Sequence, residues 1–361
     1  MSTRTVGERV IKVPDPSILQ DANAFSLDRR NFDTLDDKTA QIWRSEFLKC
    51  KRTKRFQPTR LVIEILNSCN LDCPMCRVGQ HGIDLERRME LQAFRDVLNQ
   101  CTDVRSVRLN GLGESTLVPD FSSYIDELNR RSIDIELITN GTATDEIYQQ
   151  ILSCGGKLFF SWDAASPDLF EMLRRPASWE SCLRALQQAC AYKSKVGKGL
   201  VGLLFTLQKA NVKEFARVVE LAVESCVDNV QLNVVKGGSL RWLESDLAEV
   251  LKQIELASTT ARDGKITVFL PDQINGGEIR GEVQVTSGTH CTVPETEAVI
   301  RWNGDVQVCN MFNPYTLGNV FGHGFKHAWE STFAQVFLKN LNTANCHPYC
   351  KTCAYMPKAY D

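Results

Sequence analysis

Three cysteines in one eight-residue segment are the part of the chain best suited to chemistry. Cys69, Cys73 and Cys76 follow directly after the apolar, strand-forming run 61–66. Thiolates this close together on one loop can bind three irons of a four-iron, four-sulfur (4Fe–4S) cluster, which usually takes four cysteines. The fourth iron would then be open, as the vacant position of a catalytic metal site is. Half of a zinc site and a group of buried thiols are the alternatives that this spacing leaves open.

The spacing of Cys69, Cys73 and Cys76 resembles the signature of the radical S-adenosylmethionine (SAM) superfamily, and the resemblance extends over about residues 58–240. In that superfamily SAM binds the open iron, and one electron from the reduced cluster breaks a sulfonium C–S bond. The resulting 5′-deoxyadenosyl radical abstracts a hydrogen atom from the substrate. The resemblance therefore implies a SAM-binding 4Fe–4S cluster and SAM as cofactors, with a flavodoxin- or ferredoxin-type protein as electron donor.

The order of apolar runs and helical stretches predicts an α/β fold. Strands are expected at 61–66, 104–109, 133–139, 157–162, 200–207 and 229–235, and helices at 90–100, 121–131, 145–154, 179–195, 212–226 and 241–258. Six such pairs indicate a parallel sheet with right-handed crossovers. A closed barrel would need eight. Six pairs fit the partial (β/α)6 TIM-like barrel that the resemblance implies, expected at 58–270. It would lie between an N-terminal extension at 1–57 and a small C-terminal β-hairpin and helix domain at 271–361.

The ends of the predicted strands are where a ligand of such a sheet would bind. The segment 110–115, Asn-Gly-Leu-Gly-Glu-Ser, resembles the Gly-Gly-Glu-Pro segment that binds the SAM amino group in the superfamily. It differs in that Leu112 interrupts the glycines and Ser115 replaces the proline. By the same resemblance, the residues expected to contact SAM are Met75, Gly113, Glu114, Asn140, Ser161, Asp163, Arg174 and Leu207.

Three of these SAM assignments have alternatives. Glu114 could be a solvated residue of a turn. Asp163 could cap the helix that follows it. Arg175 could replace Arg174 as the arginine that pairs with the methionine carboxylate of SAM, a contact to which a guanidinium group is suited.

A second group of cysteines lies near the C-terminus. Cys291 and Cys309 flank two short alternating runs joined by Asn303-Gly304, which is a strong hairpin signal and would bring the two cysteines together. With Cys346, Cys350 and Cys353, this layout resembles the SPASM/twitch extension of radical SAM enzymes. A full SPASM module has more cysteines and two clusters, so the five here imply one auxiliary 4Fe–4S cluster. Which of the last three cysteines bind it is left open, and zinc is the alternative.

The overall composition limits the partners and the compartment. The net charge is −2, from 42 basic and 44 acidic residues, and no stretch is basic enough to predict nucleic acid or membrane as a partner. No apolar run reaches the length of a membrane span, and the first residues lack a secretory apolar region. We therefore expect a cytoplasmic protein, in which the 14 cysteines serve metals rather than disulfides.

The substrate is expected at the barrel mouth, after the sixth strand. Lys236, Arg241 and Glu244 could bind a polar or anionic substrate there, although they could equally decorate and cap a helix. No cysteine lies between residues 226 and 291 to donate a hydrogen to a substrate radical, which favours oxidation over epimerisation. The first expectation is a natural-product enzyme, an oxidoreductase or lyase, that oxidises or rearranges a small sugar- or aminocyclitol-like molecule.

Two alternatives remain for the function. One is a maturase that crosslinks, oxidises or epimerises a ribosomally made peptide. It is the less expected function because the polar 57-residue N-terminal segment is shorter than the peptide-binding winged-helix domain of many maturases. The other is a non-enzymatic iron–sulfur carrier, which would need neither an open iron nor SAM.

Overall fold

The structure is a computed structural model. It describes residues 57–76, 83–235, 246–271, 291, 293–310 and 315–351, and the short segments 3–5, 10–12, 38–39, 41–42, 45 and 283–285. Residues 3–5 (β1, Thr3–Thr5) and 10–12 (β2, Val10–Lys12) form an antiparallel pair.

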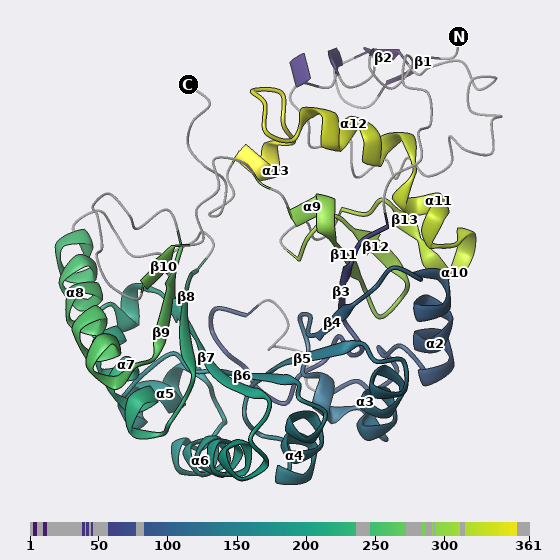
Figure 1. The fold of residues 1–361 in the computed structure, drawn as a ribbon. Helices are drawn as coiled ribbons and strands as arrows, with labels where there is room; N and C mark the ends of the chain where they lie inside the picture. The colour runs from purple at the N-terminus through teal and green to yellow at the C-terminus, as the bar shows by residue number, and fades with distance from the viewer. Residues whose placement is uncertain are drawn as a thin grey trace.

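The main body is a curved parallel sheet with helices along its outer side (Figure 1). Its six central strands are β3 (Arg60–Ile63), β4 (Ser106–Leu109), β5 (Asp134–Thr139), β6 (Lys157–Ser161), β7 (Leu200–Leu207) and β8 (Asn229–Val234). The helices are α2 (Leu91–Gln100), α3 (Phe121–Arg130), α4 (Asp145–Ser153), α5 (Pro167–Leu173), α6 (Trp179–Val196), α7 (Phe215–Glu224) and α8 (Leu247–Gly264). Each strand pairs in parallel with the next one along the chain, which confirms the predicted α/β class and the six predicted strands.

Periodic apolar residues explain why the helices cover the sheet. In α3, Phe121, Tyr124, Ile125 and Leu128 recur every three or four residues and are all buried. The ring of Tyr124 meets Phe94 of α2 edge-on at 5.2 Å, and its hydroxyl donates a hydrogen bond of 2.7 Å to a backbone carbonyl. Such packing fixes the strand ends, where the site is built.

The sheet is longer than the sequence pattern predicts. The strands β9 (Thr267–Leu270) and β10 (Val283–Val285) extend it in parallel beyond β8. At the other edge β11 (Glu297–Ile300) pairs in parallel with β3, and β12 (Asp305–Gln307) and β13 (Gly318–Asn319) follow it in antiparallel fashion. The predicted hairpin around Gly304 is confirmed, with Gly304 at a φ of 85°, and it continues the barrel sheet.

Short helices complete the C-terminal module, which we define as residues 291–351. They are α9 (Val293–Thr296), α10 (Val320–His323), α11 (Phe325–Trp329), α12 (Thr332–Asn340) and α13 (Pro348–Lys351). None of the helices in the described ranges is both long and apolar enough to cross a membrane.

The β3–β11 junction, the pairing of these two strands together with their flanking residues, carries an ion pair at each end. At the start of the strands Arg60 Nε lies 3.4 Å from Glu297 Oε2. Just past their other end Arg301 Nη1 lies 2.7 Å from Glu64 Oε2, with both side chains buried. The second pair stands at the edge of the sheet where the predicted ligand site lies.

Candidate functional site

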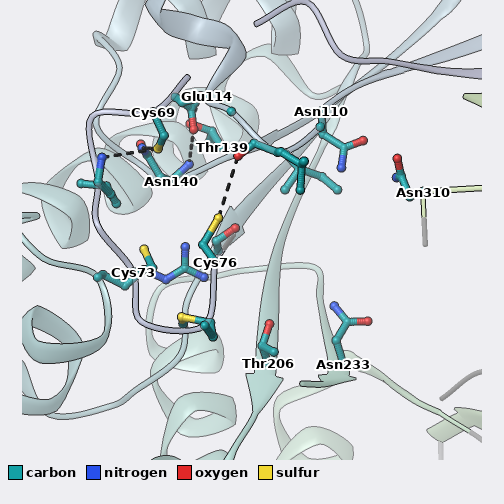
Figure 2. Close-up of a pocket in the computed structure, with 18 of the residues that line it drawn as sticks. Cys69, Cys73, Cys76, Asn110, Glu114, Thr139, Asn140, Thr206, Asn233 and Asn310 are labelled. Atoms are coloured by element: carbon teal, nitrogen blue, oxygen red, sulfur yellow. Dashed lines mark hydrogen bonds between the residues drawn. The ribbon is translucent and has the colours of Figure 1, made fainter. Parts of the chain in front are cut away.

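A cavity of about 470 Å³ opens at the carboxyl ends of the central strands (Figure 2). Its wall is made by strand ends, by the loops that follow them and by the C-terminal module. The lining residues are Cys69, Leu71, Cys73, Met75, Cys76, Asn110, Gly111, Leu112, Gly113, Glu114, Ile138, Thr139, Asn140, Ser161, Arg174, Thr206, Asn233, Val234, Val235, Asn310 and Tyr349. The three cysteines of the first motif therefore share one cavity with most of the predicted SAM contacts.

The cysteine loop is held in shape by its own backbone and by the β5 loop. The amide of Cys76 donates to the carbonyl of Cys73 at 2.9 Å. The sulfur of Cys69 accepts from the amide of Leu71 at 3.4 Å and from Asn140 Nδ2 at 3.6 Å. Hydrogen bonds of this kind stabilise a metal-bound thiolate and tune an iron–sulfur cluster.

Burial controls the protonation of these cysteines. It raises the pKa of the Cys69 thiol, and it raises the pKa of Cys73 to about 11, an effect that the nearby Arg174 guanidinium partly offsets. Without metal both thiols are therefore neutral at pH 7, and iron has to displace a proton to bind. The site fits a 4Fe–4S cluster that carries SAM. It offers three cysteine sulfurs on one wall, N–H groups that donate to the Cys69 sulfur, and the cationic side chain of Arg174. Bound there, the cluster and SAM supply the electron and the 5′-deoxyadenosyl radical for hydrogen abstraction.

Glu114 is fully engaged inside the protein. Its Oε1 accepts from Thr116 Oγ1 at 2.7 Å and from Thr139 Oγ1 at 3.1 Å, and its Oε2 accepts from the amide of Asn140 at 2.7 Å. Burial raises its pKa. The carboxylate thus ties the loop after β4 to the loop after β5, and it is not the solvated turn residue of the alternative reading. Its contact with the SAM amino group stays a prediction.

Asp163 and Arg174 form a buried ion pair at the base of the cavity. Asp163 also accepts a hydrogen bond of 2.7 Å from the amide of Thr206 and is completely buried. It therefore fixes the position of the Arg174 guanidinium group. It does not cap α5, whose N-cap is Ser166. Arg174 lines the cavity, whereas Arg175 is more exposed and pairs with Asp72 at 3.1 Å. Of the two arginines, Arg174 is therefore the one placed to meet a ligand.

The other predicted site residues are placed as follows. Met75, Gly113, Asn140 and Ser161 line the cavity. Leu207 is buried, and its carbonyl accepts from the amide of Val235 at 3.0 Å. The direct SAM contacts predicted for Asp163 and Leu207 stay predictions, since neither residue is part of the cavity wall. Lys236, Arg241, Glu244 and Cys353 lie outside the described residues.

Sequence reasoning missed a polar wall of the cavity. Asn110 follows β4, Thr206 and Asn233 lie near the ends of β7 and β8, and Asn310 follows Cys309. Figure 2 shows these four side chains in the same close-up as the cysteines. The available signal for Asn110, Thr206 and Asn233 was their position near strand ends, which many polar residues share, and Asn310 lies beyond the end of β12.

The C-terminal module brings its predicted cysteines into one folded unit. Cys346 and Cys350 are buried, and Cys291 and Cys309 are half-buried. The side chain of Asn342 joins Cys291 to the segment before Cys346, accepting from the Cys291 amide at 2.8 Å and donating to its carbonyl at 3.1 Å. These thiols suit an auxiliary cluster, and the choice of ligands stays a prediction.

Comparison with known proteins identifies the family. The model of the radical SAM superfamily matches residues 63–222, and that of the iron–sulfur cluster-binding domain SPASM matches residues 291–354. The chain belongs to the radical SAM superfamily and carries a C-terminal SPASM domain. This radical SAM enzyme uses a SAM-binding 4Fe–4S cluster, SAM and auxiliary iron–sulfur chemistry, as the resemblance implied. The carrier alternative is thereby set aside.

The similar proteins include one named as a cofactor-modifying protein and one named as a maturase. The radical SAM chain is 24% identical over 332 residues to a tungsten-containing aldehyde ferredoxin oxidoreductase cofactor-modifying protein of Pyrococcus furiosus, covering 81% of this chain and 86% of the relative. It is 22% identical over 308 residues to the mycofactocin maturase MftC of Mycobacterium tuberculosis, covering 82% and 76%. Among solved structures, Streptococcus suis SuiB bound to its precursor peptide SuiA superposes with a TM-score of 0.61 at 17% identity, covering 89% and 74%. The likeness to SuiB shows a shared fold.

Gly113 is expected to be indispensable for SAM binding. A Cβ atom there would lie 2.3 Å from the carbonyl oxygen of Leu66 and 2.5 Å from the amide of Ser68, both backbone atoms just before the cysteine loop. Gly113→Ala should push the two loops apart and weaken SAM binding by about tenfold or more, since such overpacking costs about 1–3 kcal/mol. Gly322→Ala, at a glycine with open space around its Cβ position, is the matched control and should bind SAM as the wild type does. Equal dissociation constants for all three proteins, measured by calorimetry after anaerobic reconstitution, would contradict this reading.

Iron uptake at the N-terminal site is expected to rise with pH. Because the pKa of Cys73 is raised to about 11, its proton competes with iron throughout the neutral range, and that competition weakens as the pH rises. Reconstitution at about pH 9 should load this site faster than at about pH 7. Iron and sulfide per chain are measured after a fixed time at each pH. The value for a variant with Cys69, Cys73 and Cys76 replaced by alanine is subtracted from that of the wild type. A difference that falls with rising pH would refute the expectation.

Proposed function

We propose that this radical SAM enzyme acts on a peptide, abstracting a hydrogen atom from a residue that enters the cavity and leaving an oxidised or crosslinked product. The observation that carries the proposal is the neutral, amide-rich wall formed by Asn110, Asn233 and Asn310. A primary amide side chain both donates and accepts, as a peptide group does, so the two are complementary.

Two of these side-chain amides have an oxygen without a hydrogen-bond donor among the described residues. Within the described part of the chain, Oδ1 of Asn110 and Oδ1 of Asn310 are shielded from solvent and accept no hydrogen bond. Buried polar atoms are normally paired, so a ligand with N–H donors would satisfy them. The charged groups of the wall are already engaged, Arg174 by Asp163 and Glu114 by its hydrogen-bond donors. A neutral polar backbone suits this wall better than an anionic sugar derivative.

The relatives support the same choice. One of them is named as a maturase, and SuiB has been solved with a precursor peptide. These findings favour the peptide alternative over our first expectation of a sugar- or aminocyclitol-like substrate.

The proposed reaction balances as a two-electron oxidation. With the cluster held by Cys69, Cys73 and Cys76, SAM and one external electron would supply the radical that takes one hydrogen atom from the peptide, leaving methionine and 5′-deoxyadenosine as products. The peptide radical then loses one electron and one proton. The C-terminal module is the expected electron acceptor, since Asn310 and Tyr349 of the cavity wall are the neighbours of Cys309 and Cys350.

The direct test is a mass assay with short peptides encoded beside the gene. Reconstituted enzyme, dithionite and SAM should convert one of them to a product about 2 Da lighter, the loss of two hydrogens, with one 5′-deoxyadenosine formed per product. The proposal fails if no peptide changes while a sugar or aminocyclitol is oxidised in the same assay.

The amide wall makes its own prediction for that reaction. Asn110→Ala and Asn310→Ala should each raise the KM for the peptide by about 2- to 12-fold, which is the effect of one lost hydrogen bond of about 0.5–1.5 kcal/mol. Their affinity for SAM should remain that of the wild type. Asn129→Ala, at an exposed asparagine of α3, is the control and should change neither value. Unchanged peptide kinetics in both wall variants would remove these residues from substrate binding.

A further inference from the structure

We propose that the buried pair Arg301–Glu64 is a positioning device through which the C-terminal module sets the loop Gly111–Glu114, which contains the predicted SAM contacts Gly113 and Glu114 and is called the SAM-binding loop below. Neither side chain lines the cavity. The inference rests on the radical SAM chemistry of the family and is independent of the proposed peptide substrate.

One carboxylate oxygen joins the two parts. Oε2 of Glu64 lies 2.7 Å from Nη1 of Arg301 and also accepts a hydrogen bond of 2.7 Å from the amide of Leu112, in the middle of the loop. Its other oxygen, Oε1, accepts from Nδ2 of Asn67 at 3.1 Å, two residues before Cys69. Glu64 therefore holds the module, the SAM-binding loop and the start of the cysteine loop at a single point.

The SAM-binding loop packs tightly against Glu64. A Cβ atom on Gly111 would lie 2.3 Å from Cγ and from Oε2 of Glu64, so the loop backbone rests directly on this side chain. Only 1% of the Glu64 side chain and 7% of the Arg301 side chain is exposed. A buried charge that loses its partner is strongly unfavourable, so the two side chains keep each other in place.

Arg301 is in turn oriented by the module. Its Nε donates to Oε1 of Gln307 at 2.7 Å, and Nε2 of Gln307 donates to the carbonyl of Tyr315 at 2.9 Å. The ring of Tyr315 lies 4.9 Å from that of His347 and 5.7 Å from that of Tyr349. His347 and Tyr349 are the neighbours of Cys346 and Cys350, so contacts run without a break from the auxiliary cysteines to the SAM-binding loop.

The consequence is that the conformation of the C-terminal module affects the affinity for SAM. A displacement of the segment around Tyr315 and His347 tilts Arg301, and the hydrogen bond from Leu112 to Glu64 then weakens. SAM affinity is coupled in this way to a residue that touches neither SAM nor a cysteine. Such coupling is a free energy between the module and the SAM site, so a substitution of Arg301 should change the affinity for SAM.

The test compares the two ion pairs of the β3–β11 junction. Arg301→Gln removes the charge beside the SAM-binding loop, whereas Glu297→Gln removes the pair with Arg60 at the opposite end of the same strands. In cluster-free protein, Arg301→Gln should speed amide hydrogen exchange at residues 110–116 by about tenfold, and after reconstitution it should weaken SAM binding by about tenfold. Glu297→Gln should leave both values as in the wild type.

A second variant keeps the inference testable if Arg301→Gln does not fold. Gln307→Ala leaves the ion pair in place and removes only the hydrogen bond that orients Arg301, so it should have the same effects at a smaller size, about threefold. Exchange and SAM binding that match the wild type in every folded variant at positions 301 and 307 would overturn the proposal. So would equal effects of Glu297→Gln, because the junction would then act only through general stability.

Discussion

The pairing of β3 with β11 is the constraint on which the rest of the molecule depends. Strand β3 delivers the cysteine loop, and without β11 it would be the exposed edge of the barrel sheet. Glu64, the residue that follows β3, would then lack its ion pair with Arg301. By pairing with β3, the C-terminal module closes one side of the cavity and places its own cysteine-bearing segments beside the SAM site.

The cavity divides its chemistry between two walls. On one side, burial raises the pKa of the Cys69 and Cys73 thiols, and Arg174 lies beside them with its charge balanced by Asp163. On the other side the polar groups are uncharged amides and a hydroxyl. This division suits a reaction in which a strongly charged cofactor meets a neutral substrate, as proposed above.

The sequence predicted what local spacing determines and missed what only the folded chain brings together. Three cysteines in eight residues predicted an iron–sulfur loop, because their spacing also resembles the signature of the superfamily. The six central strands were predictable from apolar runs that alternate with helical stretches, whereas β9 and β10 were not predicted, and β10 has only three residues. Asn110, Asn233 and Asn310 are far apart in the chain, and each is an ordinary polar residue until the sheet gathers them. The predicted SAM contact of Glu114 stays a prediction, and its hydrogen bonds from Thr139 and from the Asn140 amide could not be predicted because they come from another strand end.

The central claim is that SAM is cleaved at a cluster held by Cys69, Cys73 and Cys76, and one measurement tests it most directly. Anaerobically reconstituted, dithionite-reduced protein is incubated with SAM, and 5′-deoxyadenosine is quantified beside the same reaction of Cys73→Ala, with Cys101→Ala as a control at a buried cysteine outside the site. The account predicts 5′-deoxyadenosine from the wild type and from Cys101→Ala and none from Cys73→Ala. Undiminished cleavage by Cys73→Ala would contradict it.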